Sequence, residues 1–247
     1  MKTYKHLIEY ALSDECMDAA LHTASKGKKD RPEVQRLIKN AEFVKNKLRD
    51  VILNKTLKPF VHKAHEINDG FVLKKRIIIQ PHFTVNRPEQ WLQHIVIQTI
   101  KPILMRGMYE FSCGSVPGRG VHYGKKYLEK FIKSNPKKIK YVLKLDINHF
   151  YQNISTDLLK ERFQVIIKDK LMLKLIFFVL DSNIGILENG EYIRDGLPIG
   201  FYTSQWFANW FLQPLDHYIK EQLLAACYVR YMDDIVIFGT SKRELHK

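Results

Sequence analysis

The stretch YVRYMDDIVIF, residues 228–238, constrains the fold of this chain more than any other. Val229 and Ile235 favour extended structure, whereas aspartate is depleted from strands and common in turns. The stretch therefore predicts a β-hairpin whose turn carries Asp233 and Asp234. Between such apolar arms, two adjacent carboxylates repel each other and lose hydration, unless a cation offsets both costs.

A third acid, Asp146, closes the predicted strand YVLKLD. An acid at the end of one strand and an acid pair in a hairpin turn converge if the strands are neighbours in one sheet. Such carboxylates could hold two divalent ions side by side, which stabilises both oxygens of an in-line phosphoryl displacement. Oxygen ligands suit Mg²⁺, with Mn²⁺ as a substitute. The plainer alternative is that Asp146 caps the next segment while Asp233 and Asp234 only make a turn.

The chain is basic: among 247 residues, 40 Lys and Arg against 26 Asp and Glu give a net charge of +14. This balance indicates a polyanionic partner, nucleic acid before a membrane surface, although a merely solubilising surface is the simpler alternative. No apolar run approaches the roughly 18 residues of a membrane span, and the first residues lack the apolar core of a signal peptide. The 3 cysteines show neither disulfide nor zinc spacing, so we expect a cytoplasmic protein. The sequence does not specify an oligomeric state.

The order of predicted elements indicates an α+β fold. Helical periodicity fills most of residues 1–55, and strands at 58–66 and 71–79 flank the turn signal NDG. Helices are expected over PEQWLQHIVIQTIKPIL, VHYGKKYLEKFIK and roughly residues 155–181. IGILENGEYIRD predicts a hairpin around Asn189-Gly190, and a loop with a long helix precedes the acidic hairpin.

Three ordered motifs resemble those of reverse transcriptases. YMDD between apolar strands is similar to their motif C, LKLDINHFYQNI to motif A, and GLPIGFYTSQWFANWFLQPLD to motif B. The resemblance covers about residues 55–240 and implies the fingers and palm of a right-hand polymerase, with an antiparallel palm sheet flanked by helices. It divides the chain into a helical N-terminal region (1–55), fingers (56–138) and a palm (139–247), with the thumb absent.

This resemblance implies an RNA-directed DNA polymerase that adds dNTPs to a primer 3′-hydroxyl with two Mg²⁺ ions. Asp146 and Asp233 would be the main metal ligands, Asp234 the second acid of the pair, and the carbonyl of Ile147 an additional ligand. The implied partners are an RNA template, a primer strand and dNTPs. A dedicated structured RNA or an accessory protein is a further candidate partner.

Other residues match positions that contact nucleotide in this family. Tyr151, five residues after Asp146, stands where the family has an aromatic steric gate against a 2′-hydroxyl; a core aromatic is the alternative. Arg76 matches an arginine that contacts the triphosphate, with Lys74 or Lys75 as its companion, unless the lysines form only a solvated turn. The resemblance also assigns Ile199, Gly200 and Gln205 to the nucleotide, and Met232, Arg119, Lys125 and Lys126 to primer and template.

Motif B narrows the subclass. Many reverse transcriptases have PQGxxxSP, but here Pro198 is followed by Ile199 and Gly200, and Ser204 by Gln205. This form resembles diversity-generating retroelement enzymes, in which misincorporation opposite template adenine is characteristic, although those enzymes usually have valine as the second residue of YMDD. The alternatives are a bacterial antiphage-defence (abortive-infection-like) reverse transcriptase, an inactive nucleic-acid-binding palm scaffold or fragment, and an RNA-templated RNA polymerase.

Overall fold

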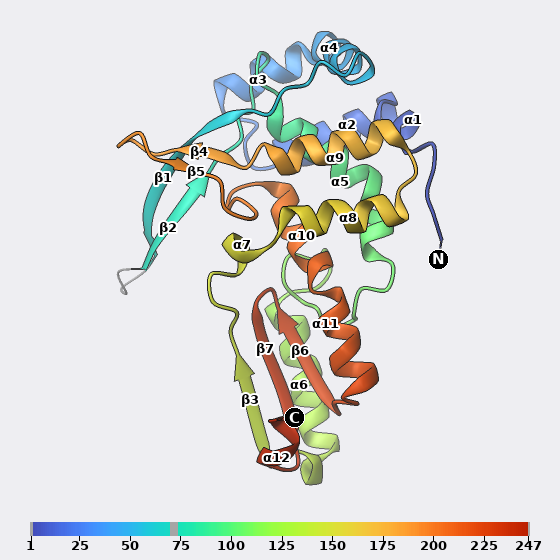
Figure 1. Ribbon diagram of the computed structural model, residues 1–247, viewed down its shortest axis with the longest axis vertical. Helices are drawn as coiled ribbons and strands as arrows, with labels where there is room; N and C mark the ends of the chain where they lie inside the picture. Colours follow the sequence, from blue (N-terminus) through green and yellow to red (C-terminus); the bar gives the residue numbers. More distant parts are fainter. Residues whose placement is uncertain (1, 70–73, 247) are drawn as a thin grey trace. The chain divides into compact units, whose positions relative to one another are not determined.

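The computed structural model describes residues 2–69 and 74–246, a mixed helical and sheet structure (Figure 1). The chain forms two compact units, each with its own sheet: unit 1 is Met1–Ile103 with Tyr151–Ser204, and unit 2 is Leu104–Phe150 with Gln205–Lys247. These units interleave along the sequence, whereas the ranges expected for N-terminal region, fingers and palm are consecutive. That three-part division stays an expectation.

Unit 1 begins with helices, as the periodicity predicts. They are α1 (Leu7–Ala11), α2 (Asp14–Ser25), α3 (Pro32–Lys39) and α4 (Ala41–Leu53). The hydroxyl of Ser13 caps α2 by accepting a hydrogen bond from the amide of Cys16. Lys45 of α4 has a side chain only 2% exposed, and its Nζ lies 2.7 Å from Asp14 Oδ1 and 3.1 Å from Asp18 Oδ1. Ion pairs therefore join α4 to α2.

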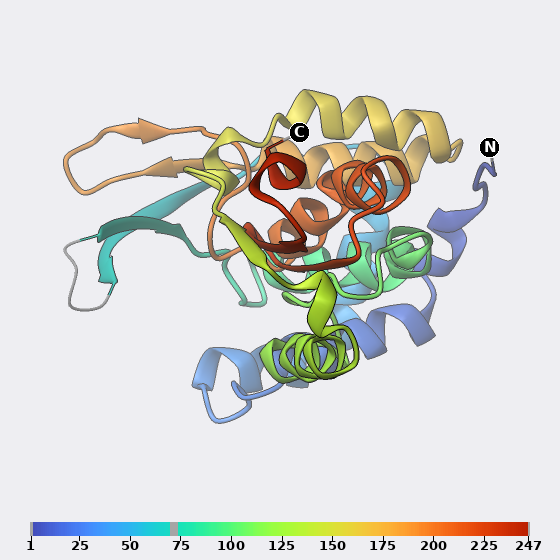
Figure 2. The same ribbon diagram turned by 90° about the horizontal axis from the view of Figure 1, so that it is seen from below.

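The sheet of unit 1 has the order β2-β1-β4-β5. Its strands are β1 (Val61–Asp69), β2 (Lys74–Ile79), β4 (Ile184–Ile186) and β5 (Tyr192–Ile193). β1 pairs antiparallel with β2 and parallel with β4, and the expected hairpin around Asn189-Gly190 joins β4 to β5. Figure 2 shows both hairpins projecting from the helices of this unit. The turn expected at residues 68–70 lies partly outside the described residues, as do the side chains of Lys74 and Lys75.

Most residues of helix α5 (Glu89–Met105) are buried, which is typical of a helix inside a core. Trp91, Ile95 and Ile100 are fully buried, and the Trp91 indole donates a hydrogen bond of 2.8 Å to the carbonyl of Met17. The other helices of this part of the chain are α7 (Phe150–Asn153), α8 (Thr156–Ile166) and α9 (Lys170–Asp181). None of the described helices is both long and apolar enough to cross a membrane.

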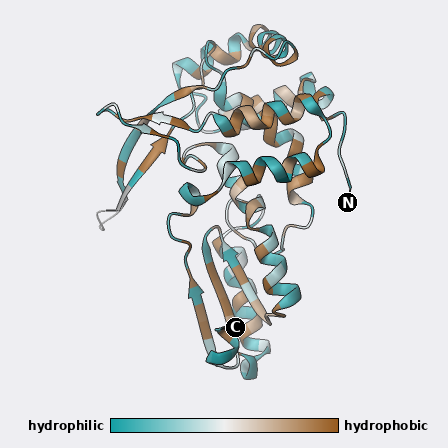
Figure 3. Ribbon diagram, in the orientation of Figure 1, coloured by the Kyte–Doolittle hydropathy of each residue, from teal (hydrophilic) through white to brown (hydrophobic). Residues whose placement is uncertain are grey.

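Unit 2 has a three-stranded antiparallel sheet of order β3-β7-β6. Its strands are β3 (Tyr141–Leu145), β6 (Cys227–Tyr231) and β7 (Asp234–Gly239), and Figure 1 shows them side by side. Figure 3 shows the apolar character of β7, which is the central strand and therefore has neighbours on both edges. Helix α6 (Val121–Ser134) contacts β6. The remaining helices are α10 (Tyr202–Phe211), α11 (Gln213–His217), a π-helical turn at Tyr218–Gln222 and α12 (Lys242–Leu245).

Candidate functional site

Strand register brings the three acidic residues to one end of the unit 2 sheet. β3 ends directly before Asp146, and its last residue, Leu145, pairs with Ile235 of the antiparallel strand β7. Asp234 is the first residue of β7 and pairs with Tyr231 of β6, so Met232 and Asp233 form the turn between these strands. The expected strand, acidic turn and strand are therefore present, with Asp234 at the start of the second strand.

The two hairpin acids have different surroundings. Asp233 is half-buried in the turn, whereas the Asp234 side chain is 51% exposed and its Oδ1 lies 3.6 Å from Nζ of Lys144. Such an exposed pair contributes only about 0–1 kcal/mol, so Lys144 is easily displaced from Asp234. Asp146 is exposed as well. Carboxylates supply the oxygen ligands that a hard divalent cation takes, and the strand register places all three at the same end of the sheet.

The turn itself is held in an unusual conformation. Met232 has a φ of 56°, in the left-handed region that costs a residue with a side chain on the order of 1–3 kcal/mol. Met232 is also 8% exposed, and its carbonyl accepts a hydrogen bond of 2.9 Å from Nη1 of Arg230. A Cβ added to Gly114 would come 2.6 Å from the backbone nitrogen of Met232, so this glycine lies directly against the turn. The surrounding residues thus fix the backbone that carries Asp233.

A fully buried ion pair supports this turn. Arg230 and Asp216 are both 0% exposed, and the guanidinium contacts both carboxylate oxygens, Nε to Oδ1 at 2.7 Å and Nη2 to Oδ2 at 2.6 Å. Nη1 also donates to Oδ1 of Asn209, on α10, at 3.0 Å. Burial alone would lower the pKa of Arg230, but its hydrogen bonds to Asp216 outweigh burial and raise that pKa. The guanidinium is therefore charged, and it joins α10, α11, β6 and the acidic turn.

The loop before α6 adds backbone support to β6. The amide of Cys113 donates to the Arg230 carbonyl at 2.7 Å, and the Arg230 amide donates to the carbonyl of Phe111 at 3.0 Å. The side-chain amide of Asn209 donates to the carbonyl of Gly114 at 2.8 Å. The segment SCG thus pairs with β6 next to the turn, and it places Gly114 against Met232.

Sequence reasoning missed Arg230, Asp216, Asn209 and Gly114 as supports of the acidic turn. One signal was available: an arginine between strand-forming residues in YVRY, which requires a buried partner if the strand is internal. Its partner could not be identified, because Asp216 and Asn209 lie on helices whose packing on β6 is a property of the fold.

Three residues expected at primer and template lie in unit 2, just before or on helix α6. Arg119 is half-buried, and its Nη1 donates to the carbonyl of Tyr109 at 2.7 Å. Lys125 and Lys126 are exposed on α6, and Nζ of Lys125 lies 3.7 Å from Glu129. The bond to Tyr109 uses one of the five N–H donors of the Arg119 guanidinium and leaves others for a phosphate, and the two lysines are open to solvent.

Several residues expected at the nucleotide belong to unit 1 and share one loop. The carbonyl of Ile199 accepts a hydrogen bond of 2.9 Å from the amide of Ile79, on β2, and the Tyr151 carbonyl accepts one of 2.8 Å from the amide of Leu197. Gly200 has a φ of 113°, and a Cβ there would lie 2.5 Å from the Ile79 carbonyl. A Cβ at residue 196 would collide with the Tyr151 carbonyl oxygen. The motif B loop, residues 196–200, is therefore fastened to both β2 and Tyr151.

Two other expected nucleotide residues lie on neighbouring elements. Arg76 is exposed on β2, where it pairs with Ile67 of β1. Gln205 is exposed on α10. Ile147, whose carbonyl was expected as a ligand, follows Asp146 directly and is half-buried.

An antiparallel sheet with acids at a strand end and in the adjacent hairpin turn resembles the palm of a nucleic-acid polymerase. The sequence profile described as "Reverse transcriptase (RNA-dependent DNA polymerase)" matches residues 84–247, well over half of the chain. The chain therefore belongs to the reverse transcriptase family.

Solved telomerase structures share this fold. Apo telomerase from Candida Tropicalis, truncated from its C-terminal domain, matches with a TM-score of 0.54 and 14% identity, over 81% of this chain and 49% of that chain. Telomerase from Candida albicans in complex with a TWJ fragment of telomeric RNA matches with a TM-score of 0.53 and 12% identity, over 81% of this chain and 43% of that chain. At such identities the similarity establishes the fold alone, and this chain spans less than half of these telomerase chains. A comparison with curated proteins found no match.

Proposed function

We propose that this chain carries the polymerising centre of an RNA-directed DNA polymerase. The observation that carries the proposal is the register of β3, β7 and β6, which gathers Asp146, Asp233 and Asp234 at one end of a sheet. The reaction joins the primer 3′-oxygen to the α-phosphorus of a dNTP, with pyrophosphate as the leaving group and the hydroxyl proton lost to solvent. The net charge of +14 suits a polyanionic template and primer.

Asp146, Asp233 and the Ile147 carbonyl would hold Mg²⁺, with Asp234 in the more peripheral position. When bound, two such ions stabilise the attacking and leaving oxygens of the displacement. The contribution of the protein is to hold these oxygens in place before the substrate arrives. Arg230 and Gly114 serve this purpose, because both contact Met232, the residue next to Asp233.

Nucleotide selection would belong to the residues around the motif B loop. Arg76 is proposed to contact the triphosphate, with Lys74 or Lys75 as a second cation. Tyr151 is proposed to lie beneath the sugar and to exclude a 2′-hydroxyl. The attachment of the loop to Tyr151 through Leu197 supports this role, because it fixes the backbone of the proposed gate.

We also propose that DNA synthesis is error-prone, as in diversity-generating retroelement enzymes. Ile199 stands where many reverse transcriptases have glutamine, and an aliphatic side chain there supplies no amide hydrogen bond near the templating pair. Copying of an RNA template rich in adenine, followed by sequencing, would test this proposal. Wild type is expected to misincorporate opposite adenine and Ile199→Gln to do so less; equal and accurate copying by both would refute it.

Primer extension on an RNA template with Mg²⁺ and dNTPs tests the activity itself. Wild type is expected to extend the primer, and Asp233→Ala is expected to lose extension by several orders of magnitude. Lys144→Ala is a matched control, since it removes a charge beside Asp234 without removing a proposed metal ligand. Undiminished synthesis by Asp233→Ala would overturn the proposal. Primer binding without synthesis by wild type would instead indicate a nucleic-acid-binding scaffold.

A further inference from the structure

Unit 1 contains a compact group of metal-ligating side chains that the polymerase chemistry does not use. His62 lies on β1, His82 in the loop after β2, and Glu89 is the first residue of α5. One ligand atom from each of the three lies within 4.8 Å of the others. Three segments of the chain therefore supply one potential ligand each.

The buried imidazole of His62 is the observation that points to a ligand. Its side chain is 1% exposed, and neither ring nitrogen forms a hydrogen bond of acceptable geometry with any described residue. Nδ1 lies 3.2 Å from Oε2 of Glu89, but the two atoms do not have the geometry of a hydrogen bond. A buried polar group normally has a partner, and an imidazole that lacks one is well suited to coordinate a metal.

Hydrogen bonds orient the Glu89 carboxylate, as is common for ligands in protein metal sites. Nε of Arg87 donates to Oε1 of Glu89 at 2.6 Å, and the backbone amide of His82 donates to Oε2 at 2.9 Å.

We propose that His62, His82 and Glu89 bind one Zn²⁺ ion that fastens β1 to the loop after β2 and to the start of α5. Two imidazoles and one carboxylate are a ligand set that zinc accepts, whereas Mg²⁺ and Ca²⁺ prefer oxygen ligands throughout. His82 is half-buried and also lines a pocket of about 280 Å³, so this ligand is accessible from solvent. This proposal stands independently of the proposed polymerase activity.

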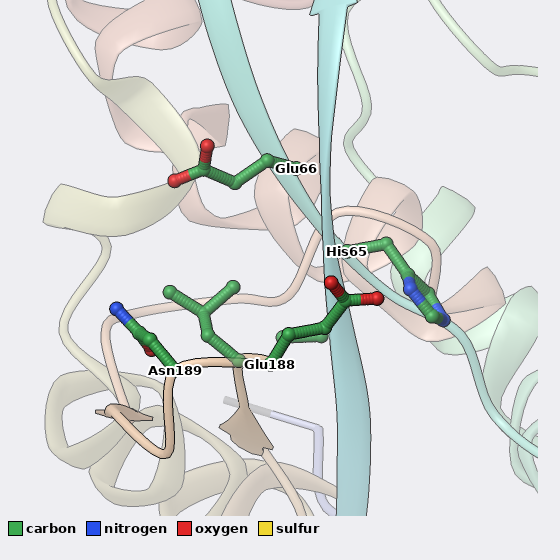
Figure 4. A pocket seen from close by; sticks show the side chains of 6 residues that line it. His65, Glu66, Glu188 and Asn189 are labelled. Atoms are coloured by element: carbon green, nitrogen blue, oxygen red, sulfur yellow. The ribbon is translucent and has the colours of Figure 1, made fainter.

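His65 provides a matched control on the same strand. It is exposed, and it lines the pocket that His82 lines as well as a second pocket, of about 440 Å³, beside Glu66, Glu188 and Asn189 (Figure 4). Because strand residues alternate between faces, His65 and the buried His62 point to opposite sides of β1. Each of the two substitutions removes one imidazole from the chain, but only His62 belongs to the proposed ligand group.

Calorimetric titration of the whole chain with Zn²⁺, in excess Mg²⁺ to saturate the acidic hairpin, tests the proposal. Wild type and His65→Ala are expected to bind one Zn²⁺ with the same affinity. In His62→Ala and Glu89→Gln the affinity should fall by more than the roughly 10- to 100-fold that loss of an orienting partner causes. Glu89→Gln keeps the size of the side chain, so it remains informative if circular dichroism shows that His62→Ala is misfolded.

X-ray absorption of the zinc complex distinguishes this site from carboxylate binding, because two imidazoles give a characteristic outer-shell scattering. The expected spectrum contains two imidazole ligands and nitrogen and oxygen distances of about 2.0–2.2 Å. Failure of wild type to bind zinc at one equivalent would overturn the proposal. Equal binding by His62→Ala and His65→Ala, or a spectrum with oxygen ligands alone, would also overturn it.

Discussion

Replacing Arg230 with methionine tests whether the buried ion pair stabilises unit 2 and holds the acidic turn. Methionine has a similar length but no charge, so the substitution leaves the Asp216 carboxylate buried without its two guanidinium contacts. Breaking a buried pair by removing one partner typically costs about 3–5 kcal/mol. Loss of the bond from Arg230 to the Met232 carbonyl adds about 1 kcal/mol. The sum is a large part of the 5–15 kcal/mol that usually stabilises a domain.

The double variant Arg230→Met with Asp216→Leu separates the charge from the packing. Removing both members of a buried pair is far less costly than removing one, because no charge remains without a partner. We therefore expect the double variant to be more stable than Arg230→Met, with a coupling energy of about 1–3 kcal/mol. Even so, it should extend primers poorly, because the Met232 carbonyl has still lost its donor.

Urea unfolding followed by circular dichroism and tryptophan fluorescence measures these differences. Lys144→Met is the control for loss of a positive charge at the surface, and we expect it to change the free energy of unfolding by less than about 0.5 kcal/mol. The reasoning is refuted if Arg230→Met costs no more than Lys144→Met. It is also refuted if the double variant loses the sum of the two single losses.

Three further changes test other features. Gly114→Ala places a Cβ 2.6 Å from the Met232 nitrogen, so we expect about 1–3 kcal/mol of destabilisation by urea unfolding and slower extension; unchanged values would mean that the loop yields easily. Tyr151→Ala should raise the use of NTPs relative to dNTPs by roughly tenfold or more in parallel extension assays, whereas Tyr151→Phe should not. Lys45, followed by Arg49, lowers the pKa of Asp14, so this contribution to stability is present above about pH 3.8 and fades as the pH falls further. Urea midpoints between pH 3 and 6 should therefore depend less on pH in Lys45→Met, and an equal dependence would contradict the assignment.

Local patterns predicted the elements that local chemistry determines. The alternation and turn residues of the acidic hairpin, the apolar period of α5 and the Asn189-Gly190 turn are each carried by a short stretch, and all are present. The pairing of β3 with β7 was a condition of the metal hypothesis, not a prediction from a local pattern, and the structure contains that pairing. Partnership across long separations was not foreseeable: β4 pairs with β1 through Ile184 and Val61, and no local pattern encodes that contact.

The division into units shows the same limit. Its boundaries at residues 103–104 and 204–205 fall inside helices α5 and α10. The amino-acid composition of a helix does not change at the point where its packing neighbours change. A division based on linkers and turns therefore gives consecutive ranges. The contacts of Arg230 with Asp216 and Asn209 could not be predicted for a related reason. Both partners lie on helices, and nothing in the sequence shows that these helices pack on β6.

The hydrogen bonds and close backbone contacts of the motif B loop limit which of its residues can be substituted. Main-chain hydrogen bonds hold Leu197 and Ile199, and residues 196 and 200 exclude any side chain, so the backbone of the loop has little freedom to change. The hydrogen bond of Ile199 uses its backbone carbonyl, so its half-buried side chain can be exchanged without breaking that bond. In the role proposed for Ile199, a substitution would change the contact with the templating base pair while the loop backbone keeps its hydrogen bonds. Under that proposal, one substitution is enough to change base selection, because the backbone that carries residue 199 need not be rebuilt.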